Sequence, residues 1–173
     1  MTNEAAGHGE VLDEARRAAM RAAARRIDRV NEWLHVGGAL QPEEYERFLE
    51  ARITHVVDLR EEDIPGVERL LELGVTRRQV PVPNGSPPTL EQLVEVAGWF
   101  ESQDDSCSLY VHCGGGFGRA ATMAIGLLIL GGAGFESALE QVRQVRPEII
   151  LNEEQVAWLR SIEPPPRLDS SAR

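Results

Sequence analysis

The chain has 173 residues, 42% of them hydrophobic, and a formal net charge of −10 at pH 7. This length and composition suit one globular domain with a full core. The acidic balance argues against a broad surface for nucleic acid or anionic lipid, so we expect no nucleic-acid partner and no membrane association. All 18 basic residues are arginine, which excludes a Walker-type phosphate loop and Schiff-base chemistry on lysine.

Cysteine and histidine usage narrows the setting further. Cys107 and Cys113 would lie roughly 20 Å apart along one extended strand, too far for a disulfide. With no apolar secretion signal at the N-terminus and no cysteine framework, we expect a reducing, cytoplasmic location. The four histidines lack the spacing of metal ligands, so neither a metal nor another cofactor is expected. The longest apolar run, 120–135, is shorter than the roughly 20 residues that cross a bilayer.

Predicted helices and strands alternate along the chain. An Ala- and Arg-rich helix over 10–30 is expected to lie against the domain. Strands are then predicted over 32–37, 53–59, 75–82 and 108–111, and helices over 41–51, 64–73, 89–102, 120–130, 135–145 and 152–162. Such alternation predicts an α/β fold with a mostly parallel sheet. We divide the chain into a polar, helical extension (1–31), one domain (32–162) and a flexible tail (163–173) after a proline run.

Residues 111–121 read as a buried strand, a glycine-rich loop and a helix start in immediate succession. Glycines let the backbone approach an anion closely, and the first helical turn offers unpaired N–H groups. Arg119 can hold two oxygens with its planar fork, and the positive field favours the thiolate of Cys113. A thiolate beneath a bound phosphate is a nucleophile. The predicted catalytic residues are Cys113 and Arg119, and the predicted phosphate-binding residues are Gly114, Gly115, Gly116, Phe117, Gly118 and Arg119.

The run from His112 to Arg119 resembles the His-Cys-x-x-Gly-x-Gly-Arg signature of the cysteine-based protein tyrosine phosphatases, and most closely their dual-specificity branch. The resemblance extends from about Glu32 to Ile162, with matches at residues 33–37, at 53–60 and at Val145-Arg146-Pro147 followed by Gln155. It implies a central, mostly parallel mixed sheet flanked by helices, with the loop at the carboxyl ends of the strands. It also implies hydrolysis of a phosphomonoester through a cysteinyl-phosphate intermediate.

Two positions depart from the pattern of that family. Its general acid is an aspartate some thirty residues before the cysteine, but the corresponding segment, 80–87, carries Asn84 there. An amide cannot donate and recover a proton. Ala120 replaces the usual Ser or Thr, whose hydroxyl eases departure of the sulfur in the second step. The substitute acids considered are Asp63, Glu62 and Glu61, for which the competing interpretation is a set of solvated loop charges.

Three hypotheses follow. The favoured one is a phosphatase of reduced or differently assisted turnover, because the loop retains both Cys113 and Arg119. We expect phosphotyrosine-like protein substrates, since an aryl leaving group needs less protonation than an alkyl one; a small phosphomonoester is the other substrate class. The alternative is an impaired pseudophosphatase that binds phosphorylated partners. The third hypothesis is that Asn84-Gly85 deamidates to restore an aspartate. The sequence leaves the oligomeric state open.

Overall fold

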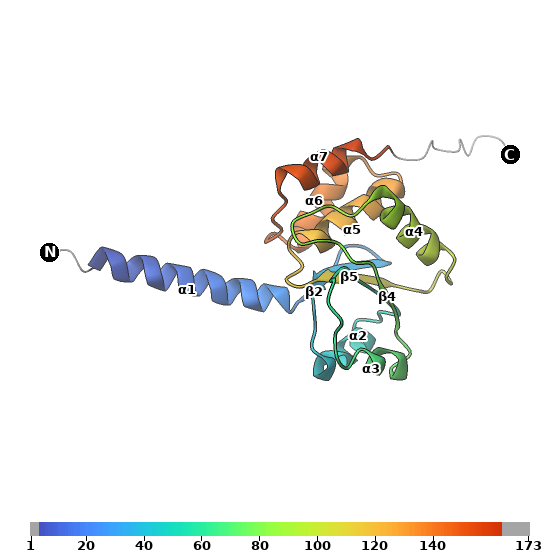
Figure 1. The fold of residues 1–173 in the computed structure, drawn as a ribbon, viewed down its shortest axis with the longest axis horizontal. Coiled ribbons are helices and arrows are strands. Elements are labelled where there is room, and N and C mark those ends of the chain that lie inside the picture. The colour runs from blue at the N-terminus through green and yellow to red at the C-terminus, as the bar shows by residue number, and fades with distance from the viewer. Residues whose placement is uncertain (1–3, 164–173) are drawn as a thin grey trace.

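A computed structural model of the chain describes residues 4–163, with side chains described from residue 14 onward. Five strands form one sheet in the order β1-β2-β5-β3-β4 (Figure 1). They are β1 (Ile27–Arg29), β2 (Leu34–Gly38), β3 (His55–Asp58), β4 (Thr76–Gln79) and β5 (Leu109–Cys113). The strands β2, β5, β3 and β4 run parallel, and β1 pairs antiparallel with β2 at the edge. The predicted mostly parallel mixed sheet is confirmed.

Helices cover both faces of this sheet (Figure 1). They are α1 (Glu4–Ala24), the short 3-10 helix η1 (Pro42–Glu44), α2 (Glu46–Glu50), α3 (Glu68–Glu72), α4 (Leu90–Glu101), α5 (Arg119–Leu130), α6 (Phe135–Val145) and α7 (Glu153–Ser161). The four helices α4 to α7 lie on one face, and the short α2 and α3 lie on the other. The α/β fold with flanking helices is therefore the one that the alternating pattern predicts.

The larger core lies between the sheet and α4 to α7, and α5 is at its centre. Residues 120–129 of α5 are all buried, which explains why this helix is apolar on every side and shows no polar face. A smaller core on the opposite face packs Phe48 of α2 and Leu70 of α3 against Tyr110 of β5. Because β5 contacts both cores, its residues are all buried and its carboxyl end is held firmly.

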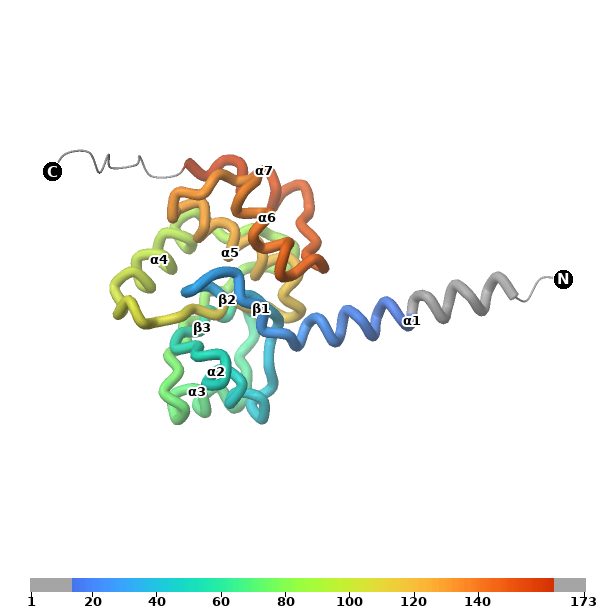
Figure 2. Tube along the Cα trace, turned by 180° about the vertical axis from the view of Figure 1, so that it is seen from behind, coloured from blue at the N-terminus to red at the C-terminus, as the bar shows by residue number. Residues whose placement is uncertain are grey.

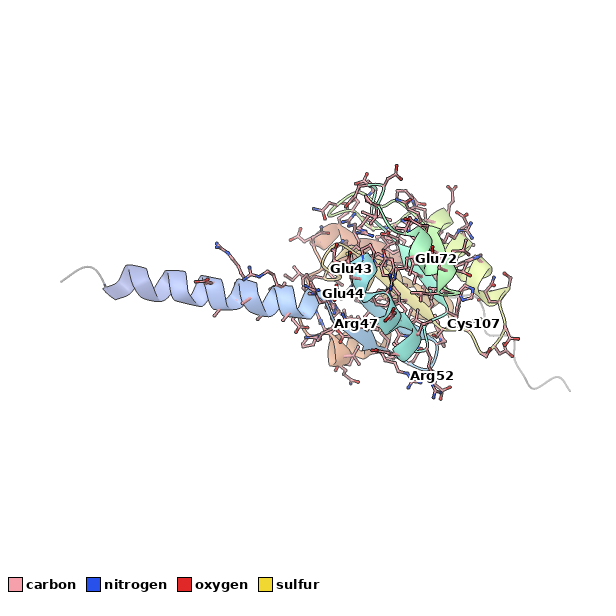
Figure 3. All side chains as sticks on the ribbon, turned by 90° about the horizontal axis from the view of Figure 1, so that it is seen from below. Glu43, Glu44, Arg47, Arg52, Glu72 and Cys107 are labelled. Atoms are coloured by element: carbon pink, nitrogen blue, oxygen red, sulfur yellow. The ribbon has the colours of Figure 1, made fainter. Side chains whose placement is uncertain are left out.

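The helix α1 projects away from the body (Figures 1 and 2) and does not lie against it as predicted. Between residues 14 and 22 only Met20 is less than fully exposed, because the helix offers mainly alanine, which gains little from burial. Its end is anchored near η1, where Arg25 pairs with Glu44 at 2.9 Å and the Arg47 side chain donates to the Arg25 carbonyl at 2.8 Å (Figure 3).

The edge strand β1 is an element that the sequence did not reveal. It consists of residues 27–29, which fall within the predicted helix over 10–30, but that helix ends at Ala24. Three residues are too few to show an alternating pattern. The predicted flexible tail, 163–173, lies outside the described residues from 164 onward. Across residues 4–163, no helix has both the length and the hydrophobicity of a membrane span.

Candidate active site

Cys113 is the last residue of β5, in the middle of the sheet. It is buried, with 4% of its surface exposed. The loop 114–118 follows, and α5 begins at Arg119 with Gly118 as its N-cap. The predicted succession of strand, loop and helix is therefore present. Cys107, in contrast, precedes β5 on the side of the body away from α1, and both thiols are free (Figure 3).

Four successive carbonyl groups of the loop accept hydrogen bonds from outside it. The donors to the carbonyls of residues 114, 115, 116 and 117 are, in order, the Ala39 amide, Arg146 Nη2, Arg146 Nε and the Ile150 amide, at 2.8–2.9 Å. In a planar trans peptide the N–H points opposite to the C=O. The amides of residues 115–118 therefore point into the loop. In agreement, the Gly116 amide donates to Cys113 Sγ at 3.3 Å.

Glycine is required at Gly116 for two reasons. Its φ of +76° lies in the left-handed region that side chains disfavour. A Cβ there would also lie 2.2 Å from the carbonyl carbon of Gly37. A Cβ on Gly38 would lie 2.8 Å from the Gly114 carbonyl oxygen, so the glycines that end β2 make room for the loop.

Arg119, at the start of α5, hydrogen-bonds to two segments outside the loop. Its Nη1 donates to the carbonyl oxygen of Val82 at 2.8 Å and to that of Leu59 at 3.3 Å. These two residues follow β4 and β3, so Arg119 also joins the segments beyond neighbouring strands. It lines a cavity of about 280 Å³, together with Asn84, Gly85, Cys113, Gly115, Phe117, Gly118, Ile150, Asn152 and Gln155.

Asn84 reaches this cleft on a tight turn. The Ser86 amide donates to the Pro83 carbonyl at 3.1 Å, and Gly85 has a φ of +84°, as a type II turn requires. Two side chains at the start of α7 hold the turn: Asn152 Nδ2 donates to the Gly85 carbonyl at 2.6 Å, and Gln155 Nε2 donates to that of Ser86 at 3.4 Å. The structure thus brings Asn84 to the cleft that contains Cys113 and Arg119.

The three acidic residues considered as substitutes are placed elsewhere. Asp63, Glu62 and Glu61 are exposed between β3 and α3, and none of them lines the cleft. The cleft-lining residues within the described chain include no carboxylate. Gln79 Nε2 donates to the Glu62 carbonyl at 3.2 Å, which fixes the backbone of this segment to β4. The hypothesis of a substitute acid from 61–63 therefore needs a movement of that segment.

Asp58, at the end of β3, is buried and ionised. Burial opposes its charge, but hydrogen bonds from Arg60 at 2.8 and 2.9 Å and from Arg77 at 2.9 Å hold the pKa of Asp58 well below its usual range. Asp58 and Arg60 therefore form a buried ion pair at the end of the sheet. Burial lowers the pKa of the neighbouring His112 to about 4 despite the charge of Asp58, so this imidazole is neutral at pH 7.

Arg146 is the residue whose contribution the sequence least revealed. The family resemblance includes this residue without giving it a role in the loop, but it is fully buried and donates to two carbonyls of the loop. The sequence offered one signal of a buried role: this arginine stands between Val145 and Pro147, at the junction of two predicted helices. Its direction toward the loop could not be read from the sequence. Ile150 and Asn152 at the cleft were missed for the same reason.

Comparison with known proteins identifies the family and the fold. Residues 37–171 match the family described as "Swiss Army Knife protein, DSP-PTPase phosphatase domain". Among solved structures, PTPMT1 is similar with a TM-score of 0.71 and 23% identity, covering 78% of this chain and 92% of that one. Tk-PTP in its active form gives 0.70 and 24%, covering 79% and 97%. Human DUSP28 gives 0.64 and 21%, covering 77% and 89%.

Proposed function

This chain belongs to the family of DSP-PTPase phosphatase domains of Swiss Army Knife proteins, and we propose that it hydrolyses a phosphomonoester through a cysteinyl-phosphate intermediate. The observation that carries this proposal is the orientation of the loop. Four amides, at residues 115–118, point inward around Cys113, and Arg119 lies at the helix N-terminus beside them. Fixed N–H donors of this kind stabilise the charge on a transferring phosphoryl group.

In the first step, Cys113 Sγ attacks phosphorus. The S–P bond forms, the P–O bond to the leaving group breaks, and that oxygen takes up a proton or leaves as an anion. Asn84 occupies the cleft without a carboxyl group to supply the proton. Substrates with a stable leaving anion are therefore favoured, which means aryl phosphates such as phosphotyrosine in a protein.

In the second step, water attacks phosphorus, the S–P bond breaks and Sγ leaves as a thiolate. The water must lose a proton, and this proton passes to a phosphate oxygen or to solvent, because the cleft-lining residues of the described chain include no carboxylate to accept it. Ala120 offers no hydroxyl to hydrogen-bond the departing sulfur. The side-chain amide of Gln155 lines the cleft and can orient the water. We therefore propose that hydrolysis of the intermediate limits turnover.

An alkyl phosphate provides the informative comparison. PTPMT1 has been solved in complex with PI(5)P, so a phosphoinositide is a suitable member of this class. In the present chain, residues 114–118 carry no basic side chain to hold further phosphates. We expect a phosphotyrosine peptide to be hydrolysed faster than PI(5)P at neutral pH. Equal rates would contradict the assignment of an aryl substrate.

The decisive experiment is rapid-mixing hydrolysis of p-nitrophenyl phosphate under reducing conditions. We expect a burst of nitrophenolate, close to one per protein molecule, followed by a slow steady state. Cys113→Ser should abolish both phases, because the nucleophile is lost. In Asn84→Asp the slow phase should accelerate. A burst that survives in Cys113→Ser would rule out the proposed nucleophile.

A second candidate function is phosphate binding without turnover. The observation that favours it is the absence of a carboxylate among the cleft-lining residues of the described chain, combined with a complete loop. A protein that binds orthovanadate but gives neither burst nor turnover would establish this candidate. In that case Cys113 and Arg119 would act only in recognition of a phosphorylated partner.

A further inference from the structure

The back of the phosphate loop rests on one buried arginine. Arg146 donates from Nη2 to the Gly115 carbonyl and from Nε to the Gly116 carbonyl, both at 2.8 Å. Its guanidinium carbon lies 5.0 Å from the centre of the Phe117 ring. The position of this guanidinium therefore determines two of the four outward carbonyl contacts and the contact with the Phe117 ring.

Arg146 is itself held by a residue from the N-terminal part of the chain. Its remaining terminal nitrogen, Nη1, donates to Asp28 Oδ2 at 2.7 Å. Asp28 belongs to the edge strand β1 and is the ion-pair partner of Arg146 among the described residues. The side chain of Arg146 has no exposed surface, so its positive charge depends on this carboxylate.

A second pair keeps Asp28 in place. Arg26 donates to both oxygens of Asp28, at 3.1 and 3.0 Å, and to both oxygens of Glu148, at 2.7 and 2.9 Å. The hydrogen bond from Arg26 lowers the pKa of Glu148 to about 2. Glu148 lies only two residues beyond Arg146. These hydrogen bonds therefore connect the end of α1, the strand β1 and the segment that follows α6.

We propose that Asp28 is a positioning residue of the active site, which acts through Arg146 on the peptide planes of the phosphate loop. If Asp28 is neutralised, Arg146 loses its counter-ion and shifts toward water. The carbonyls of Gly115 and Gly116 are then unpaired, and their peptide planes can rotate. Each rotation replaces an inward N–H by a C=O that repels the phosphate. The edge strand is on this account part of the site.

The test compares Asp28→Asn with Glu46→Gln. Glu46 pairs with Arg69 at 2.9 Å, between α2 and α3. Its replacement by Gln also removes one negative charge from an ion pair, so it serves as the matched control. Isothermal titration with orthovanadate should show about tenfold weaker binding for Asp28→Asn, as is typical when an outer partner of a site residue is removed. Glu46→Gln should bind like the parent protein, and Asp28→Glu should recover part of the affinity.

A second readout separates positioning from stability. The rate at which iodoacetamide alkylates Cys113 at pH 7 should fall in Asp28→Asn, because the Gly116 amide no longer donates to the sulfur. Cys107, mapped by mass spectrometry, is the internal reference. If folded Asp28→Asn keeps both its vanadate affinity and its rate of Cys113 alkylation within about twofold of the parent, the inference is wrong, whatever its melting temperature.

Two milder variants decide the matter if Asp28→Asn does not fold. Arg26→Gln and Glu148→Gln release the outer pair, and each should weaken vanadate binding about threefold. Unchanged affinity in both would overturn the inference. The inference rests on the proposed function only for the identity of the ligand site. If the parent protein binds vanadate but does not hydrolyse p-nitrophenyl phosphate, the proposed enzymatic function is wrong. The vanadate affinities of these variants would still decide the role of Asp28.

Discussion

Asn84 lies at the cleft on a turn that α7 holds through Asn152 and Gln155. The resemblance to the phosphatase family predicts a proton donor at this position, but the group is an amide. Replacing it by a carboxyl changes the chemistry and keeps the size of the side chain. We predict that Asn84→Asp raises the steady-state rate on p-nitrophenyl phosphate by at least about tenfold, toward the ~10²–10⁴ that general acid–base catalysis provides.

The size-matched control is Asn84→Leu, which removes the amide without adding an acid. It should show the parent rate or a lower one. The pH dependence gives a second check, because Asn84→Asp should acquire an acidic limb where the new carboxyl group titrates. If Asn84→Leu accelerates turnover as much as Asn84→Asp does, the proton-transfer explanation fails.

His112, at the same end of β5, makes the free energy of unfolding depend on pH. Its pKa in the folded chain is about 4, whereas an ordinary histidine has 6.5. The unfolded chain therefore binds a proton first as the pH falls, so the free energy of unfolding decreases between pH 6.5 and pH 4. At about 1.4 kcal/mol for each pKa unit, the loss is about 3 kcal/mol.

Urea denaturation at several pH values between 7 and 4 measures this slope. Burial also lowers the pKa of His35 and of His55, so the slope should become smaller in His112→Gln and should not vanish. The lowered pKa of Asp58 and of Glu148 adds its own loss as the pH falls from the usual carboxyl range toward their lower pKa in the folded chain. A slope unchanged by His112→Gln would show that this imidazole does not carry the effect.

At the scale of elements, the loop between β5 and α5 depends on Gly116. The left-handed φ and the 2.2 Å approach to Gly37 leave no room for a methyl group. We predict that Gly116→Ala loses measurable vanadate binding, because the peptide planes that face Cys113 must rotate. Gly74→Ala is the control: Gly74 also has a positive φ, of +74°, but no atom would lie within 4 Å of its Cβ.

Gly74→Ala should lower the melting temperature and leave vanadate affinity in the folded protein unchanged. A comparable loss of affinity in both variants would mean that backbone strain anywhere in the domain is sufficient. A Gly116→Ala protein with the parent affinity would show that the loop can accommodate a side chain.

The sequence predicted those elements whose local pattern is strong. The end of β5 and the loop after it can be recognised from the sequence, since Cys113, the glycines and Arg119 lie close together in the chain. The helix α6 matches its predicted range, 135–145, because its apolar stripe and its polar face are regular. What could not be predicted depends on distant segments. Asp28 and Arg146 are 118 residues apart, and neither carries a local sign of the other.

The projecting helix α1 shows that local composition can predict an element and still not predict where that element lies. Its composition predicts helix correctly, since alanine and arginine both favour that state. Its placement depends on what the body offers it to bury. The sheet of the body is already covered on both faces, and among the described side chains of the helix it is Ala23, near its end, that is buried.

At the scale of the whole molecule, we predict that residues 1–20 can be removed at little cost. The described side chains from 14 to 19 are exposed, whereas Ala23, Arg25 and Arg26 are the residues that attach the helix to the body. A chain that begins at residue 21 should melt within about 2 °C of the full chain and keep its vanadate affinity.

A chain that begins at residue 30 is the comparison, because it also lacks Arg26 and Asp28. It should bind vanadate more weakly even where it remains folded. Equal affinity in the two shortened chains would mean that the edge strand contributes nothing to the site. A large drop in melting temperature in the longer of the two would show that the projecting helix stabilises the body.

The four outward contacts of the loop also determine when the site is completed during folding. Ala39 lies 75 residues before the carbonyl to which it donates, and the Ile150 amide lies 33 residues after its acceptor. Contacts between such distant segments close late, after local helices have formed. A collapsed intermediate can therefore contain β5 and α5 without an assembled anion site. Phosphate recognition should return only with the last phase of refolding, when the chain is committed to its native topology.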